Sequence, residues 1–295
     1  MKTLEEYERT PEFWERVKLG GYTALKNLMK YNGKRGATRV IHFLKVSKIC
    51  SQIANATGVL DPNRAEALGL LHDFGRFMPD TLKYRSHEVI GYKLFETLGL
   101  PEIARGCMTH AIDSEYLQTE KSMSVTIKNE YDMHVAKDYF EKHGDRFDDY
   151  EVIANIVDSG YGDFEQARSI AEKKKFMIKL YGEKNTGAEK FERVIDRQRE
   201  FEEKYGIKID DVIDTTKVLT DEDLELISEH VMEGEKGAHD MADKEPSISL
   251  DELKEIFNDS MTRPIDKLRA AAPTYESLMH DSIKYACPML EDKLS

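Results

Sequence analysis

Apolar residues recur at helical intervals along almost the whole chain. In residues 1–33, aromatic and aliphatic side chains are mostly three or four positions apart, which predicts one or two helices that pack on the segment that follows. The run from Asn32 to Gly36 predicts a turn. Thr38 is then a suitable N-cap for a helix that continues to about Gly58. The apolar stripe of this helix consists of Val46, Ile49, Cys50 and Ile53.

Three further helices are predicted from their caps. Asp61 and the proline after it begin the first. Ser86 caps the second, which stops at Gly99. Pro101 opens the third. Each of these helices places a histidine near one of its ends, so the pattern predicts polar side chains at the ends of apolar helices.

The segment 113–147 differs from its neighbours because it separates two regular helical stretches, and we predict an insertion, such as a lid. Asp148 or Asp149 then caps a helix that ends at Asp158. Strongly charged helices follow, and residues 206–295 hold three or four short ones. There is no set of strands and no internal repeat, so the chain is predicted to be all-α.

Three parts are expected along the chain. Residues 1–34 are a helical extension that packs on the core, and residues 35–205 form the helical core. Residues 206–295 are a C-terminal helical region of unknown role.

The composition is that of a soluble globular protein with an ample core, with 40% hydrophobic and 34% charged residues. No apolar run reaches the roughly 18 residues of a membrane span, and the acidic N-terminus lacks the apolar stretch of a secretory signal. The three cysteines lie far apart, which favours reduced thiols and a cytoplasmic location.

Charge is unevenly distributed, although the net charge of −13 is acidic. Residues 1–112 contain 17 basic and 12 acidic residues, and the remainder carries 26 and 44. A basic first third suits a small anionic substrate. The acidic remainder argues against extended nucleic-acid binding.

Six residues stand out as candidate metal ligands because they lie at helix ends or on buried faces: His42, His72, Asp73, His87, His110 and Asp158. His42 is four positions before Val46 and so belongs to the buried stripe. Adjacent His72 and Asp73 can serve one site only where their helix is ending, since neighbours within a helix diverge by about 100°. Imidazole and carboxylate ligands suit Fe, Mn, Zn, Co or Ni.

The order of these six residues resembles that of the HD-domain metal-dependent phosphohydrolase superfamily. The segment from Leu71 to Arg76 resembles the HDxG[KR] element of the family, and that from Ser86 to Gly91 resembles the segment that often follows it. The resemblance covers about residues 35–175. It implies an HD-domain-like helical bundle with an additional C-terminal helical region.

The resemblance also implies a ligand set. The residues that match the ligands of the first metal are His42, His72, Asp73 and Asp158. His87 and His110 match the two histidines that members with a second metal add, and Asp73 then bridges the ions and has the catalytic role. The cofactor is accordingly two divalent transition metal ions, which at about 3.5–4 Å apart hold a hydroxide and clamp a phosphate ester.

Three cations are candidates for substrate binding. Arg76 matches the basic position of the family element, and its planar fork suits a phosphate oxygen. Lys83 and Arg85 precede His87 and would add positive charge at the mouth of the site.

Three functions are compatible with these residues. The first is hydrolysis of a phosphoester or phosphoanhydride bond, in a nucleotide or small phosphorylated metabolite, by a metal-activated hydroxide. The second is oxidation of a small polar substrate at a mixed-valence di-iron centre, which relatives in the superfamily build from the same ligand pattern. The third is a non-catalytic regulatory or binding role, with residues 206–295 as partner surface. The sequence leaves the oligomeric state open.

Overall fold

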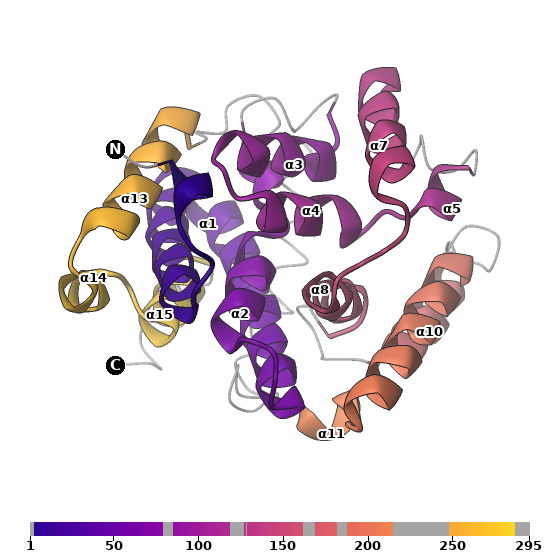
Figure 1. Ribbon diagram of the computed structural model, residues 1–295. Helices are drawn as coiled ribbons and strands as arrows, with labels where there is room; N and C mark the ends of the chain where they lie inside the picture. Colours follow the sequence, from indigo (N-terminus) through magenta and orange to yellow (C-terminus); the bar gives the residue numbers. More distant parts are fainter. Residues whose placement is uncertain are drawn as a thin grey trace.

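The computed structural model of the chain describes residues 3–78, 85–118, 127, 129–161, 169–181, 188–214 and 248–286 (Figure 1). Every regular element within these residues is helical, which confirms the all-α prediction. No helix among them is long and apolar enough to cross a membrane.

The longest element is α1 (Pro11–Thr57). Its first turn is capped by Thr10, whose hydroxyl accepts a hydrogen bond from the Phe13 amide at 3.2 Å. Gly58 ends the helix in the left-handed conformation, with φ of 70°. The predicted turn at residues 32–36 is wrong, because the helix runs through this segment.

Tertiary packing explains why α1 continues through the two glycines of this segment, Gly33 and Gly36. Glycine inside a helix costs about 1 kcal/mol relative to alanine. Burial of apolar side chains offsets this cost, since α1 packs most extensively against α2 (Pro62–Leu71), α8 (Asp149–Ser159), α13 (Leu250–Thr262) and α15 (Tyr275–Ala286). The boundary expected between the N-terminal extension and the core falls within this one helix.

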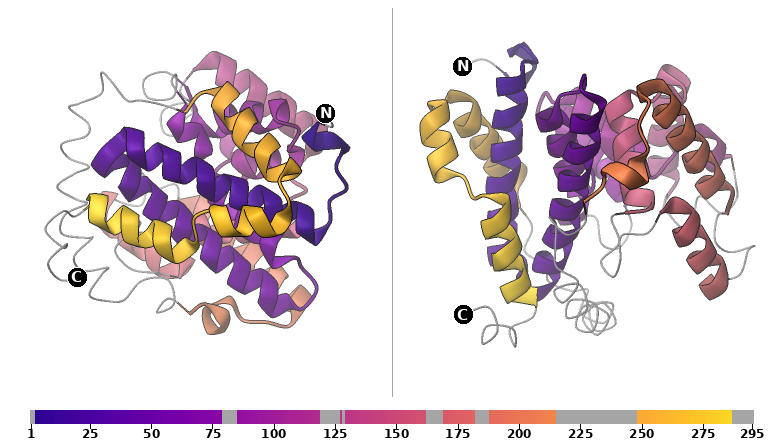
Figure 2. Two further views of the ribbon diagram at one scale, coloured as in Figure 1. Left: turned by 90° about the vertical axis from the view of Figure 1, so that its left-hand side faces the viewer. Right: turned by 90° about the horizontal axis from the view of Figure 1, so that it is seen from below.

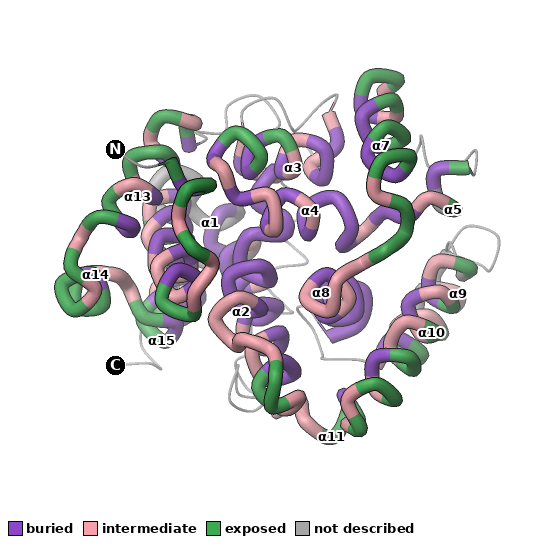
Figure 3. Tube along the Cα trace, in the orientation of Figure 1, coloured by how far each residue is buried: buried purple, intermediate pink, exposed green. Residues whose placement is uncertain are grey.

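The helices lie side by side in successive layers across the molecule (Figure 2). On one side of α1 lie α13, α14 (Ile265–Ala271) and α15. On its other side come α2, α3 (His87–Thr97), α4 (Pro101–Thr109) and then α8. The outermost pair is α9 (Ile170–Tyr181) and α10 (Ala188–Tyr205). Buried positions line the facing sides of the central helices (Figure 3) and form one apolar cluster from α1 to α15.

The predicted insertion contains α5 (Ser114–Leu117) and α7 (Glu130–His143). These helices and the facing side of α3 and α4 share a second, smaller apolar cluster that includes Val89, Met108 and Tyr139. The remaining elements are η1 (Leu4–Glu6), η2 (Phe74–Phe77) and α11 (Ile209–Val212).

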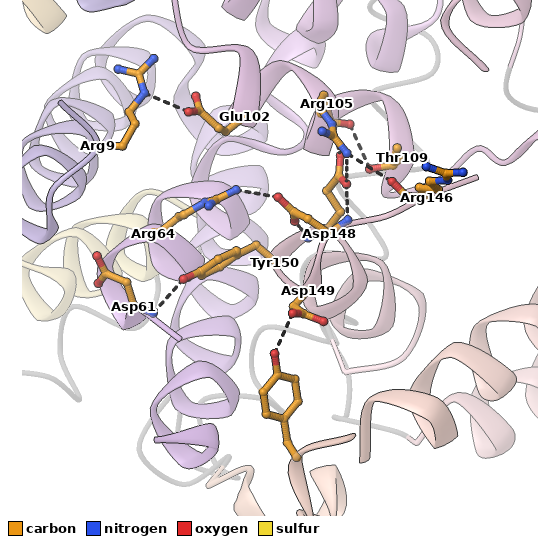
Figure 4. A network of polar contacts seen from close by, with 12 residues as sticks. Arg9, Asp61, Arg64, Glu102, Arg105, Thr109, Arg146, Asp148, Asp149 and Tyr150 are labelled. Atoms are coloured by element: carbon orange, nitrogen blue, oxygen red, sulfur yellow. Dashed lines mark hydrogen bonds and ion pairs between the residues drawn. The ribbon is translucent and has the colours of Figure 1, made fainter. Parts of the chain in front are cut away.

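The N-terminus of α8 is tied to two neighbouring helices by ion pairs (Figure 4). Asp148 caps the helix by accepting from the Glu151 amide at 2.9 Å, and it pairs with Arg64 of α2 at 2.6 Å. The buried Glu151 carboxylate accepts two hydrogen bonds from Arg105 of α4, at 3.0 and 2.9 Å. These contacts hold α8 in place, and near its other end Asp158 lies close to His42 of α1 and to His72 at the end of α2.

The C-terminal helices belong to the main core, and Phe257 of α13 tests their contribution. The side chain is fully buried in the main cluster, where its ring lies 6.5 Å from that of Phe95. Phe257→Ala is expected to lower the free energy of unfolding by about 3–5 kcal/mol, because it leaves a cavity in a packed core. Denaturant unfolding measures this, with exposed Glu255→Ala of the same helix as control. Equal stabilities would show that α13 is not part of the folding unit.

Candidate metal centre

The first group of candidate ligands comes from α1, α2 and α8. His42 on the inner face of α1 places its Nε2 3.3 Å from Asp158 Oδ1, and His72 Nε2 lies 3.5 Å from the same oxygen. One ligand atom from each of these three residues lies within 4.8 Å of the other two. This spacing is compatible with one ion that contacts all three side chains.

The second group is centred on Asp73. Helix α2 ends at Leu71, and Asp73 has left the helical conformation, with φ of −107° and ψ of 10°. The predicted helix end therefore lets His72 and Asp73 face one site. Asp73 Oδ1 lies 2.8 Å from Nε2 of His87 and 3.3 Å from Nε2 of His110.

The histidine rings are oriented by backbone carbonyls. Nδ1 of His72 lies 2.8 Å from the Gly69 carbonyl oxygen, and Nδ1 of His110 lies 2.8 Å from that of Cys107. These contacts assign the proton to Nδ1 and leave the Nε2 lone pair directed at the carboxylates. This is the tautomer that binds a metal through Nε2.

The donor atoms fit a metal because several are otherwise unsatisfied. Within the described residues, His72 Nε2, Asp73 Oδ1 and His87 Nε2 are buried and have no hydrogen-bond partner. The last two atoms are 2.8 Å apart but lack the alignment of a hydrogen bond. Buried polar atoms without partners cost about 1–3 kcal/mol each, a cost that metal coordination would remove.

Both aspartates are held in their ionised form. Burial alone would raise the pKa of Asp73, but Arg76 and the neighbouring histidines hold it well below its ordinary value. Burial is likewise outweighed at Asp158, whose pKa is held well below its ordinary value by the neighbouring His42 and His72 imidazoles. The site therefore offers two carboxylate anions at neutral pH.

Glu88, the second residue of α3, also lies at the centre, although it was not among the ligands predicted from the sequence. Its Oε2 is buried, without a hydrogen-bond partner among the described residues, and lies 3.2 Å from His87 Nδ1. Ligand atoms of His87, Glu88 and His110 lie within 4.8 Å of one another. An acidic residue in the first turn of a helix is usually explained by the helix dipole, so the sequence alone did not indicate that Glu88 could be a metal ligand.

The three candidate substrate cations differ in their surroundings. Arg76 in η2 pairs through Nε with Asp73 Oδ2, and 39% of its side chain is exposed. Arg85 donates from Nε to Asp132 Oδ1 at 2.8 Å, and its guanidinium lies over the ring of Tyr131. Lys83 lies outside the described residues. Arg76 is thus the described candidate that touches a proposed ligand.

The insertion helix α7 supports the start of α3. Asp132 is fully buried and accepts a hydrogen bond from the Ser86 amide at 2.7 Å. Ser86 is the N-cap residue of α3, but its own side chain makes no capping hydrogen bond. The Asp132 carboxylate therefore stabilises the helix end on which His87 is the first residue.

Metal affinity is expected to fall as the pH is lowered through the ordinary histidine pKa of about 6.5, because imidazole binds metal only when deprotonated. Burial lowers the pKa of His87, whereas at His110 the nearby Asp73 carboxylate outweighs burial and raises the pKa. Protons should therefore compete with the metal first at His110. Calorimetric titration with Zn²⁺ from about pH 8 to about pH 5 measures this. An affinity that stays constant over that range would contradict the assignment of histidines as ligands.

The comparison with known protein families agrees with this geometry. The model of the HD domain family matches residues 39–159, a stretch that begins before His42 and ends just after Asp158. No solved structure matches the chain. Residues 39–159 therefore form an HD domain, the domain of the metal-dependent phosphohydrolase superfamily that the order of histidines and aspartates indicated.

Proposed function

We infer that the protein is a metal-dependent phosphohydrolase that cleaves a phosphoester or phosphoanhydride bond in a nucleotide or small phosphorylated metabolite. The observation that carries this proposal is the convergence of six histidine and aspartate side chains, three of whose buried donor atoms have no other partner in the described part of the chain. The HD domain match over the same residues supports it.

The six residues would share the coordination of two metal ions. His42, His72 and Asp158 would hold one divalent ion, His87 and His110 a second, and Asp73 would bridge them. Such ions supply Lewis acidity toward a phosphoryl oxygen and lower the pKa of water.

Arg76 would orient the substrate. Its Nε is held by Asp73, 39% of its side chain is exposed, and a guanidinium has further N–H donors. These donors suit the oxygens of a phosphate group. We propose Lys83 and Arg85 as weaker contacts at the mouth, with Arg85 already engaged by Asp132.

The decisive experiment combines metal analysis with a substrate panel. Protein purified without added metal is analysed for iron, manganese, zinc, cobalt and nickel, and then assayed against nucleoside phosphates and sugar phosphates. His72→Ala should lose both bound metal and phosphate release, and exposed His134→Ala of α7 should retain both. Phosphate release that is equal in His72→Ala would overturn the proposal. Iron with substrate-dependent oxygen uptake would favour the di-iron oxygenase instead.

A further inference from the structure

Helices α9 and α10 lie outside the matched HD domain, but their inner faces carry basic side chains toward the metal centre. α10 packs against both α8 and α9. Lys173 of α9 donates from Nζ to the carbonyl oxygen of Asp158 at 3.2 Å, so α9 contacts the backbone of a proposed ligand.

A cluster of ion pairs fixes the position of α10. The buried Asp113 carboxylate accepts from Arg193 at 2.9 and 3.0 Å and from Arg197 at 3.1 Å. Arg197 also donates to Asn155 Oδ1 at 3.2 Å, and Asn155 donates from Nδ2 to the His110 carbonyl oxygen at 2.7 Å. This chain of contacts connects α10 to the backbone of a proposed metal ligand.

Lys190 lies three positions before Arg193 and therefore on the same face of α10. It is half-buried, and its ammonium makes no hydrogen bond or ion pair with the residues that the structure describes. Burial lowers its pKa, whereas the nearby charges of Asp158, Glu88 and Asp113 oppose this change. The charge of Lys190 thus interacts with carboxylates of the metal centre, although its ammonium makes no hydrogen bond or ion pair with a described residue.

Two of these carboxylates, Glu88 and Asp158, also act on the guanidinium of Arg76 in η2, together with Asp73. Two cations from different parts of the chain therefore interact electrostatically with Glu88 and Asp158. Once divalent ions neutralise those acids, the cations leave an excess of positive charge that favours a multivalent anion. A partly buried ammonium also gains from a charge-assisted hydrogen bond to a phosphate oxygen.

We propose that Lys190 is a binding residue for a phosphate group at the metal centre, so that α10 contributes to substrate recognition from outside the HD domain. This inference rests on the proposed function for its choice of ligand. It predicts an anion site formed by Arg76 on one side and Lys190 on the other.

Binding of inorganic phosphate to the metal-loaded full-length chain tests this without requiring turnover. Lys190→Gln is expected to weaken phosphate binding about tenfold or more, as loss of a charge-assisted hydrogen bond does. Lys190→Arg should restore part of the affinity. The matched control is Arg199→Gln, which removes one charge from the same helix at an exposed position, and it should bind phosphate like the unaltered protein. Calorimetry gives the affinity, and metal analysis gives the occupancy of each variant.

The outcomes separate this inference from the proposed function. Weaker phosphate binding in Lys190→Gln at unchanged metal content supports the inference even if no phosphoester is hydrolysed. Unchanged phosphate affinity overturns it even if hydrolysis is found. Loss of metal in Lys190→Gln would also overturn it, since Lys190 would then support the ligands. If a substrate is found, the variant should raise KM more than it lowers kcat.

Discussion

Asp73→Asn is expected to abolish activity and to remove bound metal from both halves of the site. The oxygen Oδ1 lies between His87 and His110, and the residue directly follows His72, so its charge serves both groups of ligands. Loss of a residue that only orients a metal ligand costs about 10- to 100-fold in affinity, and loss of the shared anion should cost more than that. Asparagine keeps the size of the side chain, which isolates the effect of charge.

Metal analysis after dialysis, followed by activity measurement with added metal, tests this expectation. The control is Asp196→Asn, which removes a carboxylate from an exposed position on α10. Full metal occupancy in Asp73→Asn would contradict the bridging role. Loss of only one of two ions would assign Asp73 to a single ion.

Gly75→Ala is expected to have the largest effect on folding at the site. A Cβ at position 75 would lie 2.0 Å from the His87 carbonyl oxygen and 2.8 Å from the Gly91 amide nitrogen. Both atoms belong to the backbone of α3, so rotation of a side chain cannot relieve the overlap. The helix must move away from η2, at a cost of about 3 kcal/mol or more, and it carries His87 with it.

Thermal unfolding and metal stoichiometry together measure this displacement. Gly58→Ala is the matched control, since a Cβ there meets nothing within 4 Å and the cost comes only from a φ of +70°. That cost should be about 1–2 kcal/mol, with metal binding unchanged. If the two variants unfold alike and bind metal alike, then η2 and α3 do not approach each other as closely as the structure shows.

Much of the site could be predicted from local sequence because its candidate ligands lie at helix ends. Asp61 does cap α2, Asp148 does cap α8, and Ser86 does precede α3. The end of α2 at Leu71 also explains how adjacent His72 and Asp73 reach one site. Caps and chain breaks depend on a few neighbouring residues, and so a local pattern can predict them.

The errors and omissions arose where distant contacts outweigh local preference. The Asn-Gly segment at residues 32–36 favours a turn locally, yet it is helical within α1, a helix that packs against α2, α8, α13 and α15. Glu88 has an ordinary local role in the first turn of a helix, and its lack of a partner is visible only in the folded chain. Lys190 lies in a charged segment with no motif of its own.

The kind of chemistry follows from residue types and their order, since imidazole and carboxylate groups at helix ends suit divalent metals in any fold that brings them together. Residue types and their order do not tell which basic side chains remain unpaired and can bind a substrate. Arg85 is engaged by Asp132, 47 positions away, whereas Lys190 makes no ion pair within the described residues and is influenced by the charge of Asp158. Whether a charge is neutralised depends on which helices become neighbours, and that is settled by burial of the shared apolar core.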